Sequence, residues 1–427
     1  MPEKNVTTPE NVAQIIEDAL EQPKNYPAAG KKPILDEISS AVSDPFWAYY
    51  TGQVLLNPDK TLRTEGGGRA VEIFEDLERD PQVRSNLQTR RLAVVGKEWH
   101  VEPATDSAQD AKVAGFVTGV LLNFDFDSAR FNLLQGILLG YKTAEIMWEY
   151  SEGDVWIREM IARPSRRFAF GLKRELRLLT RDNMVEGQPV PPRKFQLFIY
   201  GGQNGSPYGD GLGSSLYWPV WFKKNAIKFW MIFSEKFGSP TVIGKYPPGT
   251  PKEQQDALLA ALDAIQQETA IKIPDTMQVA FLEASRAGGL GNYENLCTFM
   301  NQEITKAIMG QTLTTEMGSS GGRAGGSYAA SRTHNDIRQE YTKADADVLC
   351  NALNGQMIKW LVDYNFPGVR RYPRLWIRTE GETDLKTLAE RDQILLGMGL
   401  PISQKYAYDT YGITQPSVGE ALLEKGA

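Results

Sequence analysis

The sequence predicts an α+β protein made of several parts, and three stretches lead to that fold class. Residues 45–200 combine helical periodicity with strand pairs, residues 217–237 read as one long aromatic helix, and residues 241–282 alternate strand, helix, strand and strand. With 427 residues, the chain is long enough for about two or three domains. Its 41% apolar and 23% charged residues are ordinary for globular proteins.

The balance of charge argues against a tight, general binder of phosphate backbones. The chain has 47 basic and 53 acidic residues and a formal net charge of −6, whereas such binders carry clustered positive charge. Cys297 and Cys350 are too few for a disulfide framework, and their helix-like surroundings predict buried free thiols. The first residues show no basic start followed by an apolar stretch, so we expect no secretion signal and a cytoplasmic protein.

The first part of the chain is expected to be a surface arm followed by one α+β domain. Residues 1–44 mix Pro, Asn, Lys and Glu, which is typical of an arm. A hairpin is predicted at 142–162, where aromatic and β-branched arms flank the turn SEGD. The other elements expected here are helices at 70–77, 80–95, 108–122 and 131–139 and strands at 98–103, 168–170, 176–180 and 195–200.

The aromatic helix at 217–237 holds three of the nine tryptophans. The side chains that share one sector of about 60° on such a helix are Trp218, Phe222, Phe229 and Phe233. The residues that lie roughly opposite are Lys224, Lys228 and Glu235. One side of this helix is therefore expected to be buried against protein. Its apolar runs are too short for a membrane span, which needs about 20 residues. Pro219 suits the first turn of the helix, and Gly238 suits its end.

A compact unit and two further helices follow. The expected unit has a strand at 241–245, a helix at 252–267 and strands at 270–273 and 277–282, and it is too small to fold alone. The remaining elements expected are helices at 293–309 and 328–363, a strand at 374–379, and helices at 384–398 and 403–411. In the helix at 328–363, Ile337, Tyr341, Ala344 and Val348 stand at heptad-like spacing.

No catalytic or metal site is predicted. His100 and His334 have no partners at metal-ligand spacing, and no pair of carboxylates stands out. The glycine run at 318–326 lacks the GxxxxGK[ST] pattern, and GDGLG at 209–213 lacks the third glycine of a dinucleotide-binding turn. We therefore expect no cofactor and no enzymatic activity.

The glycine-rich segment 312–327 joins two predicted helices and is longer than the usual connection of about two to eight residues. Long loops of this kind are usually functional or disordered. Two interpretations stay open: a flexible surface linker, or a mobile loop held between two rigid helices in a channel.

Three long segments, in collinear order over nearly the whole chain, carry a resemblance to a known family. They are DLERDPQVRSNLQTRRLAVVGKEWHVEP, GDGLGSSLYWPVWFKKNAIKFWMIFSEKFGSPTVIGKYPPG and AIMGQTLTTEMGSSGGRAGGS. The chain resembles the portal proteins of Mu-like tailed bacteriophages and related prophages. The resemblance implies a portal fold with an α/β wing, a two-helix stem, a small β-α-β-β clip and a mostly helical crown.

By order along the chain, the resemblance implies the following parts: an N-terminal arm at 1–44, a wing at 45–213, stem helix 1 at 214–237, a clip at 238–285, stem helix 2 at 286–310, a tunnel loop at 311–327, a wing helix and strand at 328–383, and a crown at 384–427.

The resemblance also implies a function. The family forms a ring, typically of twelve subunits, at one capsid vertex, through which DNA is packaged and later ejected. The expected partners are double-stranded DNA without sequence preference, the terminase large subunit, the major capsid and scaffold proteins, and head-completion or connector proteins, with no membrane. The expected location is the virion, after assembly in the host bacterial cytoplasm. The first alternative is another head-tail adaptor or connector protein, and the second is a nucleotide-binding enzyme.

The residues expected to act divide among three parts. The DNA-facing tunnel loop would contain Thr314, Thr315, Gly318, Ser319, Ser320, Gly321, Gly322, Arg323, Gly325 and Gly326. The stem contacts between subunits would come from Trp218, Trp221, Phe222, Lys224, Lys228, Phe229 and Phe233. The clip would dock terminase or connectors through Lys245, Tyr246, Lys252 and Glu253. A loop poor in cations suits sliding contact, because each neutralised phosphate adds affinity. Arg323 is expected either to contact phosphates transiently or to be a solvated loop arginine.

Overall fold

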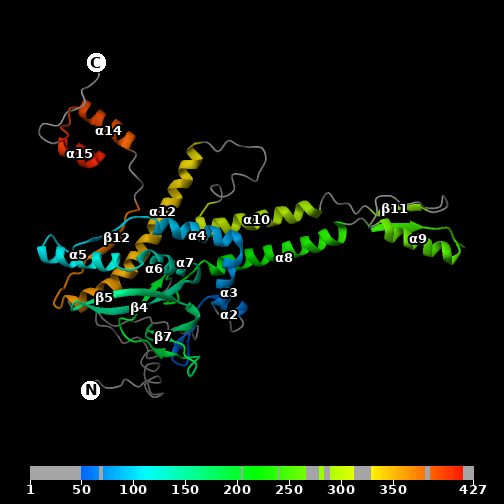
Figure 1. Ribbon diagram of the computed structural model, residues 1–427, viewed down its shortest axis with the longest axis horizontal. Coiled ribbons are helices and arrows are strands. Elements are labelled where there is room, and N and C mark those ends of the chain that lie inside the picture. The colour runs from blue at the N-terminus through cyan, green and yellow to red at the C-terminus, as the bar shows by residue number, and fades with distance from the viewer. Residues whose placement is uncertain are drawn as a thin grey trace, which may run out of the picture. The chain divides into compact units, whose positions relative to one another are not determined.

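The computed structural model describes residues 50–66, 71–202, 205–238, 241–265, 278–282, 289–311, 328–379 and 385–416. The chain divides into two compact units, Met1–Ile377 and Arg378–Ala427, and each is described by itself. Figure 1 shows the elements in chain order. The predicted arm at 1–44, the strand at 270–273 and the glycine-rich segment 312–327 lie outside the described residues.

The first unit is built on a three-stranded antiparallel sheet of β4 (Tyr141–Ser151), β5 (Asp154–Arg163) and β9 (Phe195–Ile199), in the order β5-β4-β9. The predicted hairpin at 142–162 is confirmed. Its turn residues Glu152 and Gly153 both have positive φ, 53° and 90°, which matches the twist of a tight hairpin. The register shifts between Met147 and Trp148, because Arg158 is an extra residue between their partners Glu159 and Ile157 and makes a bulge in β5.

Helices cover this sheet and share one hydrophobic core with it. The helices of this part of the chain are α2 (Lys60–Glu65), α3 (Glu72–Glu75), η2 (Asp76–Arg79), α4 (Pro81–Val95), α5 (Ala108–Leu122), α6 (Phe126–Leu133) and α7 (Gly136–Leu139). Asp80 caps α4 by accepting from the N–H groups of Gln82 and Val83, and Pro81 occupies the first helical position. Helices at 80–95 and 108–122 are confirmed, whereas the helix predicted at 131–139 is two short ones.

A second, smaller sheet has the strand order β1-β2-β6-β7-β8. Its strands are β1 (Tyr50–Thr51), β2 (Val54–Leu55), β6 (Phe168–Gly171), β7 (Leu176–Leu178) and β8 (Gln188–Pro189), with the 3-10 turn η3 (Ser165–Arg167) before β6. Tyr141, Phe170 and Tyr208 meet edge to face in its own small core. Strands β1, β2 and β8 are too short to leave a periodic pattern in the sequence.

The chain later returns to the first core through a long helix. This consists of α12 (Tyr328–Leu353), a π-helical turn η5 (Asn354–Ile358) and α13 (Lys359–Asn365). It is followed by β12 (Arg374–Ile377), which pairs with β3 (Trp99–Glu102). Within the π turn, the side chain of Asn354 donates to the carbonyl of Leu375 at 3.0 Å and accepts from its N–H at 2.8 Å.

The residues at heptad-like spacing do not mark the buried side of α12. Ala344 is exposed, and Ile337, Tyr341 and Val348 are half-buried. Among the α12 residues whose burial is described, the buried side chains are Thr342, Asp345, Ala346, Leu349, Cys350 and Leu353. Asp345, a charged residue, belongs to this side because it is buried in an ion pair.

Between the two long helices described below, the chain forms β10 (Thr241–Lys245), α9 (Lys252–Ile265) and β11 (Gln278–Leu282). The two strands are antiparallel, with Thr241 opposite Leu282 and Lys245 opposite Gln278. Gly244 is needed here, because a Cβ would lie 2.9 Å from the side chain of buried Leu258.

The second unit contains α14 (Leu385–Gly397) and α15 (Gln404–Tyr411). These helices meet at Asp392, which accepts from Tyr411 at 2.8 Å and from Arg391 at 2.8 Å. Asp392 is the only buried side chain among the described residues of this unit. Polar contacts rather than an apolar core therefore join the two helices.

Candidate functional site: two long helices and the junction at their base

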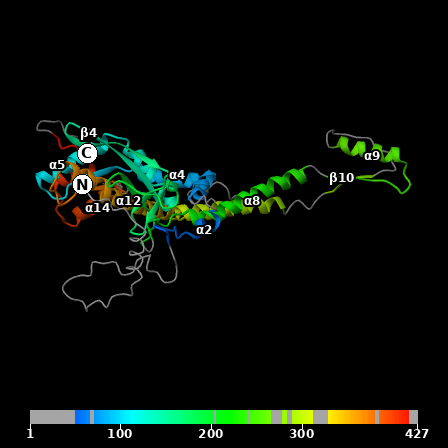
Figure 2. The ribbon, with the colours of Figure 1, turned by 90° about the horizontal axis from the view of Figure 1, so that it is seen from below.

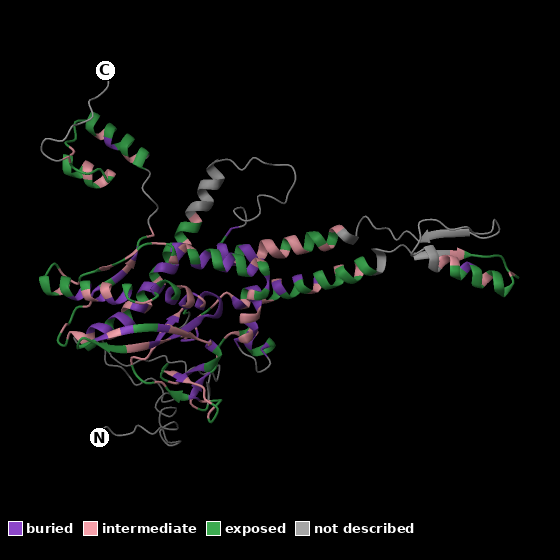
Figure 3. Ribbon diagram, viewed as in Figure 1, coloured by how far each residue is buried: buried purple, intermediate pink, exposed green. Residues whose placement is uncertain are grey.

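Helix α8 (Gly213–Gly238) is the long aromatic helix that the sequence predicts. It begins four residues earlier than the predicted range of 217–237, so Pro219 lies inside the helix and the prediction that it occupies the first turn is wrong. The earlier start follows from burial: Leu216 and Val220 are buried in the main core, which stabilises a turn that lacks one backbone donor. Figure 3 shows α8 buried near its start and mostly exposed further along.

Three sides of α8 have different chemistry. The side packed in the chain's own core carries Leu216, Val220, Lys223 and Ala226. The aromatic side carries Trp218, Phe222 and Phe229, and these remain exposed, Phe229 at 55%. The third side carries exposed Lys224 and Lys228 together with Trp221, which is 45% exposed and stands three and seven residues before them. The expectation that one side is buried is confirmed, but within one chain the buried side is not the aromatic one.

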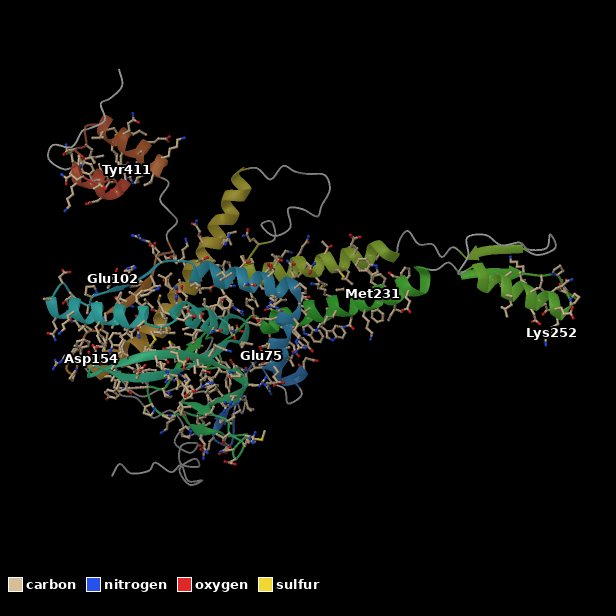
Figure 4. The ribbon with its side chains drawn as sticks, in the orientation of Figure 1. Glu75, Glu102, Asp154, Met231, Lys252 and Tyr411 are labelled. Carbon is tan, nitrogen blue, oxygen red and sulfur yellow. The ribbon has the colours of Figure 1, made fainter. Side chains whose placement is uncertain are left out.

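The aromatic side chains of α8 form an ordered surface. The Trp221 ring lies 5.9 Å from Trp218 and 5.2 Å from Phe222, in both cases edge to face. Met231, labelled in Figure 4, and Ile232 are also exposed further along the helix, Met231 on the side that carries Lys224. Exposed aromatic side chains in mutual contact of this kind mark an interaction site.

Helix α10 (Gly289–Met309) packs antiparallel against α8, and the two helices lie side by side in both Figure 1 and Figure 2. At the far end, the rings of Phe233 and Tyr293 lie 6.0 Å apart, and this contact leaves Phe233 half-buried. At the near end, Ile304 and Ile308 are buried in the main core beside Leu216. The predicted helix at 293–309 is confirmed, and the pair forms a two-helix rod whose base is fixed in the sheet-bearing core.

A buried ion pair ties the base of α8 to α4. Lys223 Nζ lies 2.8 Å from Asp80 Oδ2 and donates to Oδ1 at 3.0 Å. The same carboxylate caps α4, so one acidic side chain satisfies both a helix start and a buried cation. Lys223 therefore belongs to the anchor of the rod, unlike its neighbour Lys224.

Polar contacts of Thr305 tie the base of α10 to α4. Thr305 is buried on α10, and its hydroxyl accepts from Gln82 Nε2 at 2.8 Å and from Asn86 Nδ2 at 3.0 Å, both on α4. The hydroxyl itself donates to the carbonyl of Asn301. Both rod helices are thus held by the same few residues at the start of α4.

Arg90, further along α4, forms the most connected contact of the junction. Its guanidinium donates to Asp345 at 2.7 and 2.9 Å, to the Ile308 carbonyl at 2.6 Å and to the Tyr200 hydroxyl at 2.7 Å. The Tyr341 ring lies 4.7 Å from Arg90 Cζ. Burial alone would lower the pKa of Arg90, but the hydrogen bonds and charge of Asp345 outweigh it and raise that pKa.

This guanidinium contacts both helices that flank the glycine-rich segment. Ile308 lies in the last turn of α10, and Asp345 lies on α12. After α10, Gly310 has a φ of 71° and its N–H donates to the Lys306 carbonyl at 2.9 Å, which ends the helix. A Cβ on Gly310 would lie 2.7 Å from the Tyr341 ring. The end of α10 is therefore joined to α12 at Asp345, 17 residues after α12 begins.

All ten predicted tunnel-loop residues, from Thr314 to Gly326, lie outside the described residues. The predicted clip residues Lys245, Tyr246, Lys252 and Glu253 are exposed, on the end of β10 and the start of α9. Figure 4 labels Lys252 at that position. In the described ranges no group of His, Cys, Asp and Glu side chains could hold a metal ion, and no described helix is long and apolar enough to cross a membrane.

The glycines of GDGLG have a structural role. A Cβ on Gly209 would lie 2.1 Å from the Gly140 carbonyl oxygen, and one on Gly211 would lie 2.3 Å from the Gly140 amide nitrogen. At Gly213 a Cβ would lie 2.3 Å from the Phe74 ring. This stretch passes so close to the start of β4 that only glycine fits, and it leads the chain into α8.

The two cysteines differ from expectation in one respect. Both are free thiols, and Cys350 is buried on α12, where burial raises its pKa to about 12. Cys297 is only half-buried on α10, so the prediction that both are buried is wrong for Cys297. It lies on a part of α10 that one chain alone does not enclose.

Sequence reasoning missed the anchor residues Asp80, Arg90, Lys223, Thr305 and Asp345. A signal existed for Arg90: Val83, Leu87 and Val94 lie on the apolar stripe of α4, and Arg90 falls on the same stripe. A charged residue at a stripe position indicates a buried partner, but the sequence does not say which of the many carboxylates supplies it.

Comparison of folds defines the class of protein. The chain is similar to a chain in the virion of a native gene transfer agent particle, with a TM-score of 0.55 and 13% identity, covering 86% of this chain and 97% of that one. It is also similar to a chain in the neck of the native particle computed with C12 symmetry, with a TM-score of 0.55, 14% identity, and coverage of 80% of this chain and 94% of that one. The chain therefore shares its fold with these two chains of gene transfer agent particles.

Sequence comparison gives the family. Residues 71–413 match the family described as the portal protein of Mu bacteriophage. The portal protein of Escherichia phage Mu is 30% identical over 366 residues, which cover 82% of this chain and 68% of that protein. The Mu-like prophage FluMu protein gp29 of Haemophilus influenzae is 26% identical over 363 residues, covering 83% and 69%. The chain belongs to the portal protein family of Mu-like bacteriophages, a family of structural virion components rather than enzymes.

Proposed function

We propose that this portal protein forms a closed ring, of twelve subunits, at one capsid vertex, and that DNA is packaged and ejected through the ring. In this proposal α8 and α10 are the stem, residues 238–285 are the clip that docks the terminase large subunit and later the connector proteins, and residues 311–327 are the DNA-facing tunnel loop. Residues 45–213 and 328–383 are the wing and residues 384–427 the crown. The ring assembles in the host cytoplasm with the capsid and scaffold proteins.

The observation that carries the proposal is the three-sided chemistry of α8. A ring with head-to-tail contacts needs each subunit to offer two different surfaces to its two neighbours. Helix α8 keeps one side in its own core and leaves exposed an aromatic side, around Phe222 and Phe229, and a second side that carries Trp221, Lys224 and Lys228. The subunit number of twelve is supported by the symmetry of the related gene transfer agent neck.

The test truncates one aromatic residue on each exposed side of α8 without disturbing the subunit. Trp221→Ala and Phe229→Ala should weaken assembly by about 2 kcal/mol or more each, because buried aromatic side chains dominate such interfaces. Sedimentation velocity should show the rings of the unchanged protein replaced by smaller species. Circular dichroism melting of the dissociated subunit should change little, because both side chains are half exposed within one chain.

Tyr150→Ala is the matched control, since Tyr150 is an aromatic residue 83% exposed at the tip of the β4–β5 hairpin. It should leave assembly unchanged. If both α8 variants assembled like the unchanged protein, the exposed sides of α8 would not be the contacts between subunits.

A further inference from the structure

A cluster of positive charge lies on the first unit, away from the stem helices. Its members are Lys359 at the start of α13, Arg370 and Arg371 in the following turn, and Arg374 at the start of β12, and all four are exposed. We call these four residues the basic patch. Only one acidic residue, Asp363, occurs in the sequence between Lys359 and Ile377, whereas the whole chain has a net charge of −6. The patch is therefore a local exception to the acidic composition of the chain.

Aromatic rings hold the patch together. Lys359 Nζ lies 5.6 Å from the centre of the Tyr372 ring, and Arg374 Cζ lies 5.0 Å from the centre of the Trp376 ring. Arg370 and Arg371 directly precede Tyr372 in the same turn. The cations are thus grouped around two fixed rings rather than scattered along a flexible segment.

The nearby carboxylates are already engaged. Asp363 accepts from the Tyr372 hydroxyl at 2.7 Å and forms an ion pair with Arg193 at 3.1 Å. Glu102, opposite Arg374 in the β3–β12 register, lies 3.2 Å from His100 Nε2. Within the described ranges, no carboxylate lies within ion-pair distance of any patch cation, so the four charges are available to a ligand.

We propose that the basic patch binds the phosphates of duplex DNA. Lysine and arginine side chains on an exposed surface contact phosphates without reading base sequence. Each of the two rings has one of the patch's own cations over it, which leaves less ring surface for stacking single-stranded bases. Duplex DNA fits this chemistry better than a single strand does.

The position of the basic patch indicates which DNA it would contact, and this step rests on the proposed function. Figures 1 and 4 show β12 and the labelled Glu102 of β3 at the end of the first unit opposite to Met231 on α8. If the stem and clip point outward to terminase, the patch points into the capsid. The DNA it binds would be the packaged genome lying over the ring, distinct from the duplex moving through the channel.

The experiment compares two charge-matched triple variants of the full-length protein. The patch variant combines Lys359→Gln, Arg370→Gln and Arg371→Gln. It removes three of the four patch charges and keeps the contact between Arg374 and the Trp376 ring. The control triple combines Lys173→Gln, Arg167→Gln and Arg181→Gln. It removes one lysine and two arginines that are exposed elsewhere on the first unit. Binding of a fluorescent duplex is followed by anisotropy between about 50 and 200 mM NaCl, the range over which phosphate contacts lose affinity steeply.

The patch variant should bind at least about tenfold more weakly, and its slope of log affinity against log salt should fall by about 2 to 3, because each lost phosphate contact removes about one unit. The control triple should bind like the unchanged protein. Equal binding by the patch variant overturns the proposal, and so does an equal loss in both triples, which would indicate net charge alone. Binding of polyglutamate in preference to DNA, lost in the patch variant, would assign the surface to an acidic protein instead.

Ring formation is scored separately by electron microscopy of the same three proteins. If all three proteins form rings but the patch variant binds DNA like the unchanged protein, only the proposal that the basic patch binds DNA is overturned. An unchanged protein that forms no rings contradicts the proposed function, and the patch is then judged by the same comparison of the two triples.

Discussion

Arg90 is buried at the point where α4, α10 and α12 meet, and it compensates an equally buried charge on Asp345. Replacing only Arg90 leaves that carboxylate in the core without a partner. Arg90→Met should therefore lower the free energy of unfolding by about 3–5 kcal/mol, measured by urea denaturation. Arg90→Met with Asp345→Leu should recover part of the loss, because no buried charge remains.

Arg84→Met is the control for Arg90, since Arg84 is exposed on the same helix and should cost less than about 0.5 kcal/mol. A single Arg90→Met change as mild as Arg84→Met would show that the Arg90 contacts do not hold the base of the stem.

The close approach of Gly211 to Gly140 gives a second prediction for a single residue. Gly211→Ala places a Cβ 2.3 Å from a backbone nitrogen and 2.4 Å from the Leu138 carbonyl oxygen, so the backbone must shift. We expect a loss of about 1–3 kcal/mol in unfolding free energy, as for other overpacked sites. Gly115→Ala on α5 is the control: nothing lies within 4 Å of its Cβ, and a helical alanine should stabilise by about 0.5–1 kcal/mol. If Gly211→Ala and Gly115→Ala changed the unfolding free energy equally, the glycines of GDGLG would have no role in packing.

Among the elements, periodicity predicted most helices and the central hairpin but not the packing of each helix. For α8 the sequence shows a strong aromatic sector, and hydrophobicity alone assigns that sector to the interior. The weaker stripe of Leu216, Val220 and Ala226, interrupted by Lys223, is the one buried in the chain. Periodicity ranks sides by apolar content, whereas burial within one chain depends on which side faces α4 and α10. A strongly aromatic side that is left exposed is the expected result when other subunits cover it.

The glycine-rich segment gives a prediction for an element. Because Arg90 contacts both flanking helices, the stem should not need residues 318–326 to stay folded. Deleting residues 318–326 should leave ring assembly intact and impair DNA packaging or retention, measured by the amount of nuclease-protected DNA in assembled particles. Arg323→Gln, which keeps the length, is the control and tests the phosphate contact of Arg323 separately. Failure of the deletion variant to form rings would make the segment part of the architecture.

For the whole molecule, the α+β fold class and the family could be predicted from the sequence, because long collinear segments carry the resemblance. The anchor of the stem could not, since Asp80 and Lys223 are distant in sequence, as are Arg90 and Asp345. No local pattern pairs such residues. The assembled state could not be predicted either, because one chain shows only the exposed sides of α8 that an assembly would cover.

The central claim is that this chain closes into a ring through its stem helices. Electron microscopy of the purified full-length protein tests it most directly. We expect closed rings of about twelve subunits with a two-helix stem from each subunit around a central channel. A stable monomer or dimer at every concentration, with the aromatic side of α8 still exposed to solvent, would contradict it.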